Sequence, residues 1–383
     1  MRDLDPRVLT WRHHLHRIPE IAFEEHQTSA YVARVLSDLG YAVTTGIGGT
    51  GLVGSLTRGC SGRAVALRSE LDGLPISEES GVEHPSEHPS RMHACGHDGH
   101  MAMLLGAAAR LAAEGGFDGS VHALFQPAEE PGRGAQRMVD DGLFEQFPVQ
   151  GVYGIHNQPG APAGHLLTRS GPIMASEDNF TIRVTGRGGH ASAPHLVIDP
   201  LVVAAEIVVA LQHVVARNVD PVRTAVLSCT DLVTDGARNA IPTYVTITGD
   251  TRSFDRDVQA LLEHRIREVS AGVAAAHGAS ATVNYTHEFA STANDPACVS
   301  VAERAATTAL GTARVDVHAN PIMASEDFGV LATQVPGCLA FLGNGTEPDA
   351  GGIPLHSHDY RFNDAILPAG AAYYTEVVRE SLS

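Results

Sequence analysis

The sequence contains no lysine, because all 26 residues counted as lysine or arginine are arginine. This absence excludes a Schiff base to pyridoxal phosphate, a lysine nucleophile and the lysine of a phosphate-binding P-loop. Positive charge is scarce as well, since 44 acidic residues give a formal net charge of −18. A chain this acidic repels phosphate backbones and anionic lipid surfaces. We therefore expect neither a nucleic-acid partner nor a membrane partner.

Cysteine and long apolar runs are also sparse. The five cysteines are widely spaced and odd in number, a pattern that favours a reducing compartment over a disulfide framework. Residues 1–12 lack the apolar core of a signal peptide. The best apolar run, residues 201–216, is interrupted by Glu206, Gln212 and His213, which favours a buried helix over a membrane span. We expect a cytoplasmic protein.

The chain is long enough for two or three domains at about 150 residues each. Short apolar runs at 52–56, 64–68, 121–125 and 151–155 are typical of buried strands, and helical periodicity appears at 6–39, 98–113 and 136–144, with Asp98 as the expected N-cap. Strands that alternate with helices predict an α/β sheet covered on both faces. Gly46–Gly51 fits a dinucleotide-binding fingerprint, but a strand follows it where a helix is needed, so we interpret it as a turn.

A second type of pattern begins near residue 175. The predicted order to residue 290 is β-α-β-β-α-β, which is typical of a ferredoxin-like α+β sandwich. The α/β pattern resumes after that point. The sequence thus predicts a catalytic domain made of residues 1–174 and 291–383, interrupted by an inserted domain of residues 175–290.

Metal-capable side chains are concentrated between residues 92 and 100. His93, Cys95, His97 and His100 fall within eight residues, just before a predicted helix. A thiolate and an imidazole two residues apart suit a borderline metal such as zinc. The alternative is a histidine-rich surface loop or a buried free cysteine.

Acidic and imidazole groups follow three predicted strands at the point where each strand ends. They are Glu70 and Asp72, then Glu129 and Glu130, then His156. Ligands of open α/β sheets bind outside the carboxyl ends of the strands, so we expect these side chains to lie close together. Adjacent glutamates suit metal-assisted hydrolysis, in which one carboxylate holds an ion while its neighbour takes a proton from water. Taken alone, each group could equally be part of a polar surface.

Taken together, these motifs make the chain resemble a known family. The chain is similar to the aminoacylase and hippurate hydrolase branch of the co-catalytic metallopeptidases, which includes the plant indole-acetyl-amino-acid hydrolases. The likeness covers nearly the whole chain and rests on an ordered set of motifs: Leu15–Glu20, Arg68–Ile76, Met92–His100, Phe125–Glu130, Gly186–Pro194, Asn239–Pro242, Ala324–Phe328 and Leu355–Ser357.

This resemblance implies a metal-dependent amidohydrolase that cleaves the amide bond of N-acyl amino acids. It implies two divalent ions per subunit, zinc first with manganese or cobalt as alternatives. The implied metal ligands are Cys95, His97, Glu130, His156 and His356. Cys95 is our choice for a bridging ligand.

The resemblance also implies roles for residues that do not hold metal. Glu129 would be the general base, and Asp72 would orient a ligand histidine. The inserted domain would be a lid that forms a homodimer, with His190 stabilising the oxyanion and Asn239 holding polar groups of the substrate. By its charge alone, Arg252 is a candidate for the substrate carboxylate.

Two departures from the family pattern bear on the site. Glu70 stands where the family usually has aspartate, and His358 stands where it usually has proline, so His358 competes with His356 as a ligand.

Three other functions stay open. A metallo-carboxypeptidase or dipeptidase is the nearest rival. A cysteine hydrolase with Cys95 as nucleophile and a non-catalytic metal-binding homologue are the others.

Overall fold

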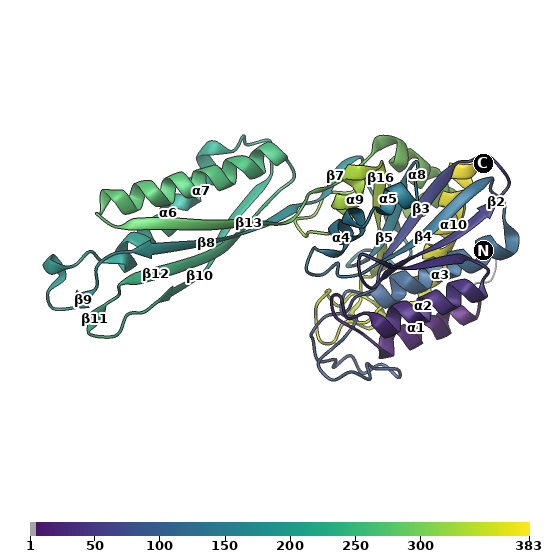
Figure 1. Ribbon diagram of the computed structural model, residues 1–383, viewed down its shortest axis with the longest axis horizontal. Helices are drawn as coiled ribbons and strands as arrows, with labels where there is room; N and C mark the ends of the chain where they lie inside the picture. Colours follow the sequence, from purple (N-terminus) through teal and green to yellow (C-terminus); the bar gives the residue numbers. More distant parts are fainter. Residues whose placement is uncertain (1–4) are drawn as a thin grey trace. The chain divides into compact units, whose positions relative to one another are not determined.

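The computed structural model describes residues 5–383 and divides them into two compact units (Figure 1). The first unit contains the described chain up to Ile173, together with Thr292–Pro321 and Glu326–Ser383. The second contains Met174–Ser291 and the short piece Ile322–Ser325, which the sequence did not indicate.

The first unit is built on an eight-stranded mixed sheet. Its strand order is β1-β2-β4-β3-β5-β16-β6-β15. The strands are β1 (Ala42–Ile47), β2 (Gly51–Arg58), β3 (Ala64–Glu70), β4 (Gly119–Gln126), β5 (Val152–Pro159), β6 (Leu166–Leu167), β15 (Val315–Asp316) and β16 (Gly337–Gly345). Strand β3 runs parallel to both β4 and β5, and β5 runs parallel to β16, so their carboxyl ends share one edge of the sheet. Every residue of β3 and β16 is buried, as expected for apolar strands covered on both faces.

Helices of the first unit supply the rest of its core. Helix α3 packs against α1 and α10, and α10 also packs against α8. The helices are α1 (Arg7–Arg17), α2 (His26–Asp38), α3 (His97–Glu114), α4 (Gly134–Asp140), α5 (Leu143–Gln146), α8 (Pro296–Leu310), α9 (Phe328–Gln334) and α10 (Leu367–Leu382). Two short strands, β7 (Gly171–Met174) and β14 (Thr292–Asn294), pair with each other.

Two local expectations were wrong. The helical pattern of residues 6–39 is interrupted between α1 and α2, where Pro19 lacks an N–H donor and Phe23 adopts a φ of 62°. Asp98 does not cap α3, because that helix begins at His97. The Asp98 carboxylate instead accepts a hydrogen bond from His16 Nδ1 at 2.7 Å and pairs with Arg12 Nε at 3.1 Å. The Asp98 side chain, which the local sequence pattern predicted to cap the helix, instead forms a buried ion pair.

The second unit is a four-stranded antiparallel sheet with two long helices. Strand order is β10-β12-β8-β13, and the chain order β8-α6-β10-β12-α7-β13 is the predicted one. The elements are β8 (Ser176–Thr185), α6 (Pro200–Asn218), β10 (Ala225–Thr234), β12 (Tyr244–Ser253), α7 (Arg256–Ala276) and β13 (Ser280–Phe289), with a small ribbon of β9 (Gly189–His190) and β11 (Ala240–Ile241). Residues of β8 alternate between buried and exposed, so one face of this sheet packs on the helices.

Helix α6 joins the core of the second unit. Within residues 5–383, it alone is long and apolar enough to cross a membrane by length and composition. Val203, Ile207 and Leu211 of this helix are buried in the hydrophobic core that the unit forms with its sheet.

Candidate metal centre and catalytic site

The carboxyl ends of β3, β4 and β5 bring the candidate residues of the first unit to one edge of the sheet. Glu70 is the last residue of β3, and the turn that carries Glu129 and Glu130 follows the last residue of β4. His156 lies in the second half of β5. The loop before α3 adds Cys95, and His97 begins that helix.

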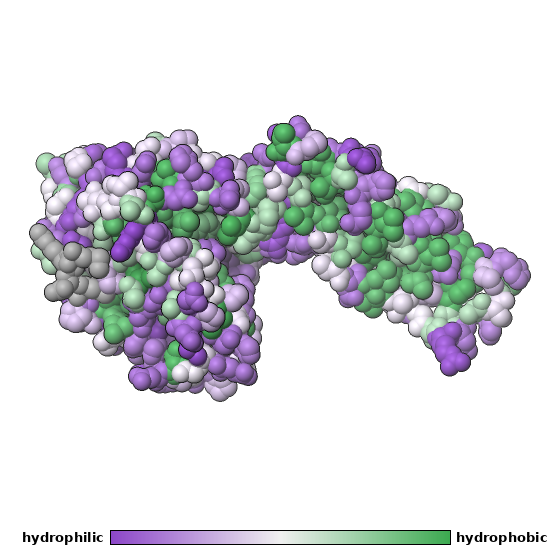
Figure 2. All heavy atoms as spheres, turned by 180° about the vertical axis from the view of Figure 1, so that it is seen from behind, coloured by the Kyte–Doolittle hydropathy of each residue, from purple (hydrophilic) through white to green (hydrophobic). Residues whose placement is uncertain are grey.

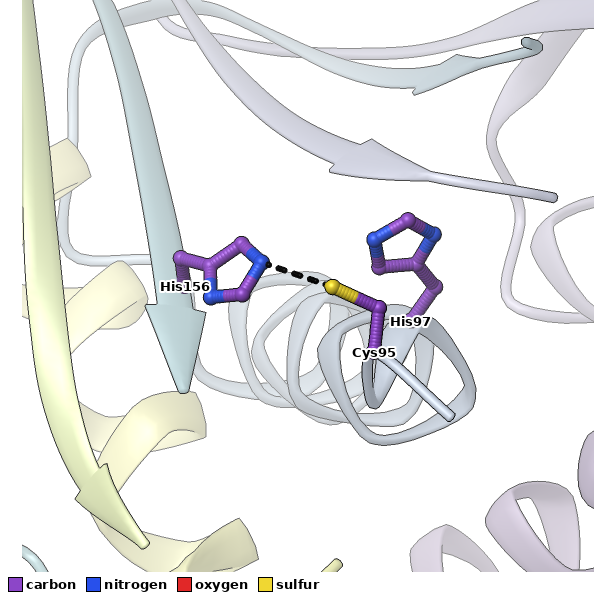
Figure 3. A group of neighbouring side chains, drawn as sticks. All are labelled: Cys95, His97 and His156. Carbon is purple, nitrogen blue, oxygen red and sulfur yellow. Dashed lines mark hydrogen bonds between the residues drawn. The ribbon is translucent and has the colours of Figure 1, made fainter. Parts of the chain in front are cut away.

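Cys95, His97 and His156 form a buried group of possible metal ligands (Figure 3). Cys95 Sγ lies 3.3 Å from His156 Nε2. His97 Nδ1 donates to the backbone carbonyl of Asp72 at 2.8 Å, so in the neutral ring Nε2 is the free acceptor. This Nε2 is buried and has no hydrogen-bond partner among the described residues. One sulfur and two imidazole nitrogens are ligands that zinc prefers.

A second group shares the same thiol. Cys95, Glu130 and His356 also place their ligand atoms within 4.8 Å of one another. His356 Nε2 lies 3.5 Å from Glu130 Oε2, and the His356 backbone N–H donates to Ala94 O at 2.9 Å, beside the cysteine. His358 instead faces Glu79 at 3.4 Å. The geometry therefore favours His356 over His358 at this position.

Asp72 and Glu129 lie beside these groups. The Asp72 carboxylate contacts both groups, with Oδ1 3.4 Å from His97 Nδ1 and Oδ2 accepting the Glu130 backbone N–H at 3.0 Å. Glu129 Oε2 lies 3.9 Å from His97 Nε2. Glu129 therefore lies at the edge of this cluster of possible ligands.

Three buried carboxylates hold the turn of residues 127–135 that presents Glu129 and Glu130. Glu25 accepts the Ala128 N–H at 2.9 Å, Asp72 accepts the Glu130 N–H as above, and Asp327 accepts the Ala135 N–H at 2.9 Å. Ala128 needs such support because its φ of 48° is left-handed. Glu25 and Asp327 could not be predicted from the sequence as partners of this turn, because they lie about 100 and 190 residues from it.

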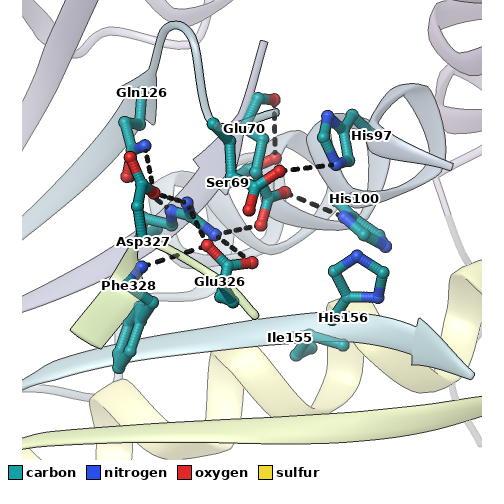
Figure 4. Close-up of polar contacts among 12 residues, drawn as sticks. Ser69, Glu70, His97, His100, Gln126, Ile155, His156, Glu326, Asp327 and Phe328 are labelled. Carbon is teal, nitrogen blue, oxygen red and sulfur yellow. Dashed lines mark hydrogen bonds and ion pairs between the residues drawn. The ribbon is translucent and has the colours of Figure 1, made fainter. Parts of the chain in front are cut away.

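Asp327 also belongs to a buried ion network (Figure 4). Arg68 contacts Glu70 closely and pairs with Glu326 at 2.8 Å and Asp327 at 3.0 Å. Glu70 in turn accepts a hydrogen bond from His100 Nδ1 at 2.8 Å. The motifs Arg68–Ile76 and Ala324–Phe328 contain these groups, but sequence spacing gave no sign that they meet.

Burial and neighbouring carboxylates shift the ionisation of the site. Burial, then Glu326 and Glu130, raises the pKa of Glu129 well above its ordinary value, and burial raises the pKa of Glu130 to about 7. A carboxylate with a raised pKa is a better proton acceptor near neutral pH. Burial also raises the pKa of the Cys95 thiol well above its ordinary value, which is the opposite of what a cysteine nucleophile needs.

The imidazoles behave differently from one another. Burial lowers the pKa of His156 to about 3, so its ring is neutral, as a metal ligand must be. For His97, burial lowers the pKa, but the Asp72 side chain and the other nearby carboxylates outweigh it and raise the value to about 10. An ion that binds His97 must therefore displace a proton.

These residues fit a divalent metal centre. His97 Nε2, Asp72 Oδ1 and Glu130 Oε1 are buried polar atoms without hydrogen-bond partners among the described residues. Buried polar atoms rarely go unpaired in native proteins unless a water or ion is bound there. Cys95 belongs to both groups of possible ligands, so these side chains could hold more than one ion.

The remaining candidates lie in the second unit. His190 and Asn239 are brought together there, since β9 pairs with β11 and Ala191 N donates to Asn239 O at 3.0 Å. Arg252 is engaged by Glu177 at 2.9 Å and Asp250 at 2.7 Å. Its guanidinium also donates to the backbone carbonyl of Met323 at 3.1 Å.

Comparison with known proteins gives one family. The sequence profile described as peptidase family M20/M25/M40 matches residues 66–380. The chain is 38% identical over 380 residues to a hippurate hydrolase from Campylobacter jejuni, covering 99% of this chain and 98% of that protein. It is 35% identical to an N-acetyl-L-cysteine deacetylase from Bacillus subtilis, covering 90% and 82%. A solved dinuclear metal-binding peptidase of family M20 from Bacillus subtilis matches with a TM-score of 0.85 and 28% identity, covering 98% of each chain.

Proposed function

Because this chain belongs to peptidase family M20/M25/M40, we propose that it is a metal-dependent amidohydrolase that cleaves the amide bond of N-acyl amino acids. The observation that carries the proposal is the shared edge of the sheet, where Cys95 joins two groups of metal-capable side chains beside Glu129. The names of the relatives above supply the substrate class: an acyl group joined to the nitrogen of an amino acid.

We propose that Cys95, His97, Glu130, His156 and His356 would hold two divalent ions; Cys95 is common to both groups of side chains. Such ions lower the pKa of a bound water and polarise the substrate carbonyl. The thiolate and imidazole donors favour zinc, and manganese or cobalt are the alternatives.

Glu129 is the proposed general base. Its buried carboxylate takes a proton from the attacking water and then delivers it to the nitrogen of the leaving amino acid. Asp72 keeps the His97 ring in place, because the backbone carbonyl of Asp72 accepts from Nδ1 and directs Nε2 toward the centre. In this proposal Glu129 moves the proton from the water to the leaving amine, and Asp72 orients His97.

The second unit is proposed to act as a lid that supplies His190 and Asn239. Ser192 donates its backbone N–H to His190 Nδ1 at 3.1 Å, so in the neutral ring the proton sits on Nε2. An imidazole with a proton on Nε2 can donate a hydrogen bond to an oxyanion. Asn239 would bind polar groups of the substrate. Arg252 is less suited to bind the substrate carboxylate, since carboxylates of its own unit already engage it.

We also propose a homodimer through this unit. Leu201, Val202 and Val209 on α6 are 41%, 54% and 65% exposed, and an open groove of about 660 Å³ joins α6 to Val269 and Val273 of α7. Figure 2 shows hydrophobic residues gathered on the second unit. An exposed apolar area of this kind is typical of a protein interface. Val209→Asp should yield monomers in sedimentation, and an unchanged oligomeric state would contradict this surface.

A reducing compartment such as the cytoplasm fits the free thiols of all five cysteines.

The test is hydrolysis of acetyl-, benzoyl- and long-acyl-amino acids and of dipeptides, before and after chelation and again with zinc, manganese or cobalt. We expect N-acyl amino acids to be cleaved, activity to vanish with chelator and metal to restore it. Preference for dipeptides would favour the carboxypeptidase or dipeptidase alternative. Metal binding without turnover on any substrate would favour the non-catalytic one.

A further inference from the structure

The structure assigns a positioning role to Glu70, which we propose holds Cys95 and His156 in register through His100 and Asn157. None of these contacts involves a substrate. The inference rests on the proposed metal centre, because Cys95 and His156 are two of its proposed ligands.

Glu70 must accept two hydrogen bonds at once. One carboxylate oxygen contacts the Arg68 guanidinium closely, and the other accepts the N–H of His100 Nδ1 at 2.8 Å (Figure 4). The side chain is 0% exposed, so bulk water cannot replace either partner. A carboxylate is the side chain that offers an acceptor in both directions.

The Glu70 contact fixes the tautomer of His100. With the proton on Nδ1, the neutral ring presents the lone pair of Nε2, which accepts the backbone N–H of Asn157 at 2.9 Å. The opposite tautomer would set two N–H groups against each other. The carboxylate at position 70 thus decides which end of the ring can hold Asn157.

Asn157 connects the strand to the cysteine loop. Its Nδ2 donates to the backbone carbonyl of Cys95 at 2.6 Å, and its Oδ1 accepts from the Tyr360 hydroxyl at 2.9 Å. It directly follows His156, whose Nε2 lies 3.3 Å from Cys95 Sγ. The loop fits tightly here, because a Cβ at Gly96 would approach Asn157 Nδ2 to 2.5 Å. A shift of Asn157 would therefore move the backbones of both proposed ligands.

Glutamine at position 70 cannot do the same work. It has one acceptor oxygen and one amide nitrogen, so an N–H of the amide must face either Arg68 or the His100 N–H. If His100 changes tautomer to relieve the conflict, its Nε2–H then faces the N–H of Asn157. Aspartate keeps both acceptor oxygens, although its reach is one methylene shorter. Glu70→Gln should therefore disturb the hydrogen bonds that run from Glu70 through His100 and Asn157 to the Cys95 carbonyl, which we call the Glu70 relay. Glu70→Asp should restore part of this relay.

The experiment compares the full-length parent, Glu70→Gln, Glu70→Asp and a control, Glu20→Gln. Glu20 is a buried carboxylate of the same unit, which accepts from the backbone N–H of Thr28 at 2.9 Å. Zinc affinity is measured by competition with a chelator, and the absorption spectrum of the cobalt-substituted protein reports the thiolate–metal bond. Partners that orient metal ligands typically contribute 10–100-fold in metal affinity. We expect Glu70→Gln to weaken zinc binding about 10–100-fold and to alter the thiolate band, Glu70→Asp to lie between it and the parent, and Glu20→Gln to match the parent.

A Glu70→Gln protein with parental affinity and spectrum would overturn the inference. Equal losses in Glu70→Gln and Glu20→Gln would overturn it too, because they would indicate general destabilisation. If Glu70→Gln does not fold, Tyr360→Phe removes one hydroxyl from the far end of the relay, and a parental thiolate band in that variant would overturn the inference. A parent that binds cobalt without any thiolate band would instead refute the proposed metal centre, so the two failures are distinguishable.

Discussion

Replacing Arg68 by methionine should strongly destabilise the first unit at neutral pH. The Arg68 guanidinium contacts Glu70, Glu326 and Asp327, and all four side chains are at most 1% exposed. Methionine keeps an unbranched apolar side chain but lacks the guanidinium, so the change removes the charge together with some volume. It would leave three buried carboxylates without their cation.

The expected loss is about 3–5 kcal/mol or more, the typical cost of removing one partner of a buried pair. It should also depend on pH. In the parent, burial raises the pKa of Glu70, but Arg68 and His100 outweigh it and hold the value well below its ordinary range. Ionised Glu70 therefore stabilises the parent above its unfolded pKa. In Arg68→Met burial dominates, the folded pKa rises above the unfolded one, and stability falls as pH rises between them. The difference between parent and variant should shrink as pH falls toward 5.

The assay is urea unfolding of the metal-free proteins, followed by tryptophan fluorescence. Trp11 is the single tryptophan and is buried in the first unit, so its signal reports that unit. Arg91→Met is the control, because Arg91 pairs with exposed Glu24 at 3.0 Å and should contribute at most about 1 kcal/mol. A loss as small as that of the control, or one that does not shrink at pH 5, would show that Arg68 does not stabilise these buried carboxylates.

Four further outcomes are expected. Glu129→Gln should lower kcat about 10²–10⁴-fold while bound metal, measured by elemental analysis, is kept; near-normal turnover would show the base to be misassigned. In Gly134→Ala the new Cβ would lie 1.5 Å from Pro127 O, so the turn that presents Glu129 must shift. We expect kcat to fall at least about 100-fold, the order of a general base's contribution. Gly272→Ala, whose Cβ meets nothing within 4 Å, should be neutral in the same assay. Burial lowers the pKa of His122 to about 4, so the unfolded state takes up a proton first as pH falls. Roughly 2–3 kcal/mol of stability should therefore be lost between pH 7 and 4. Urea unfolding should show a smaller loss over this range in His122→Gln. Chelation should lower the unfolding temperature seen by Trp11 fluorescence, since ions at about 100–1,000 times their Kd stabilise by roughly 3–4 kcal/mol; an unchanged temperature would indicate that no ion binds the folded first unit.

Local periodicity was enough to predict most of the regular elements. The buried strands of the first unit and the β-α-β-β-α-β order of the second follow from apolar patterns that the chain displays within 5 to 20 residues. The break between α1 and α2 was missed although Pro19 lies there, because helical periodicity continues on both sides of it. Short strands such as β6 and β15 were also missed, since two residues carry no periodicity.

The candidate site was predicted to the extent that its residues stand at strand ends or in motifs. Parallel strands collect their carboxyl ends at one edge, so Asp72, Glu129 and His156 could be grouped without coordinates. The carboxylates that hold the turn beside those residues could not be predicted in this way. Glu25 reaches Ala128 from a helix N-terminus, and Asp327 reaches Ala135 across about 190 residues, so the pairings depend on the folded topology and leave no mark in local spacing.

The same edge of the sheet concentrates negative charge that the fold must tolerate. The carboxylates of Glu70, Asp72, Glu129, Glu130, Glu326 and Asp327 gather there, and the nearby cations are Arg68 and a protonated His97. Six ionised carboxylates would far outnumber these cations, and two divalent ions would offset most of the difference. Backbone N–H groups of the turn offset part of the repulsion, since Asp72 and Asp327 each accept one. The remaining repulsion between carboxylates either raises their pKa values, as at Glu129, or favours the binding of cations. This concentration of buried carboxylates is consistent with the proposed metal centre and with the proposed role of Glu129 as the base.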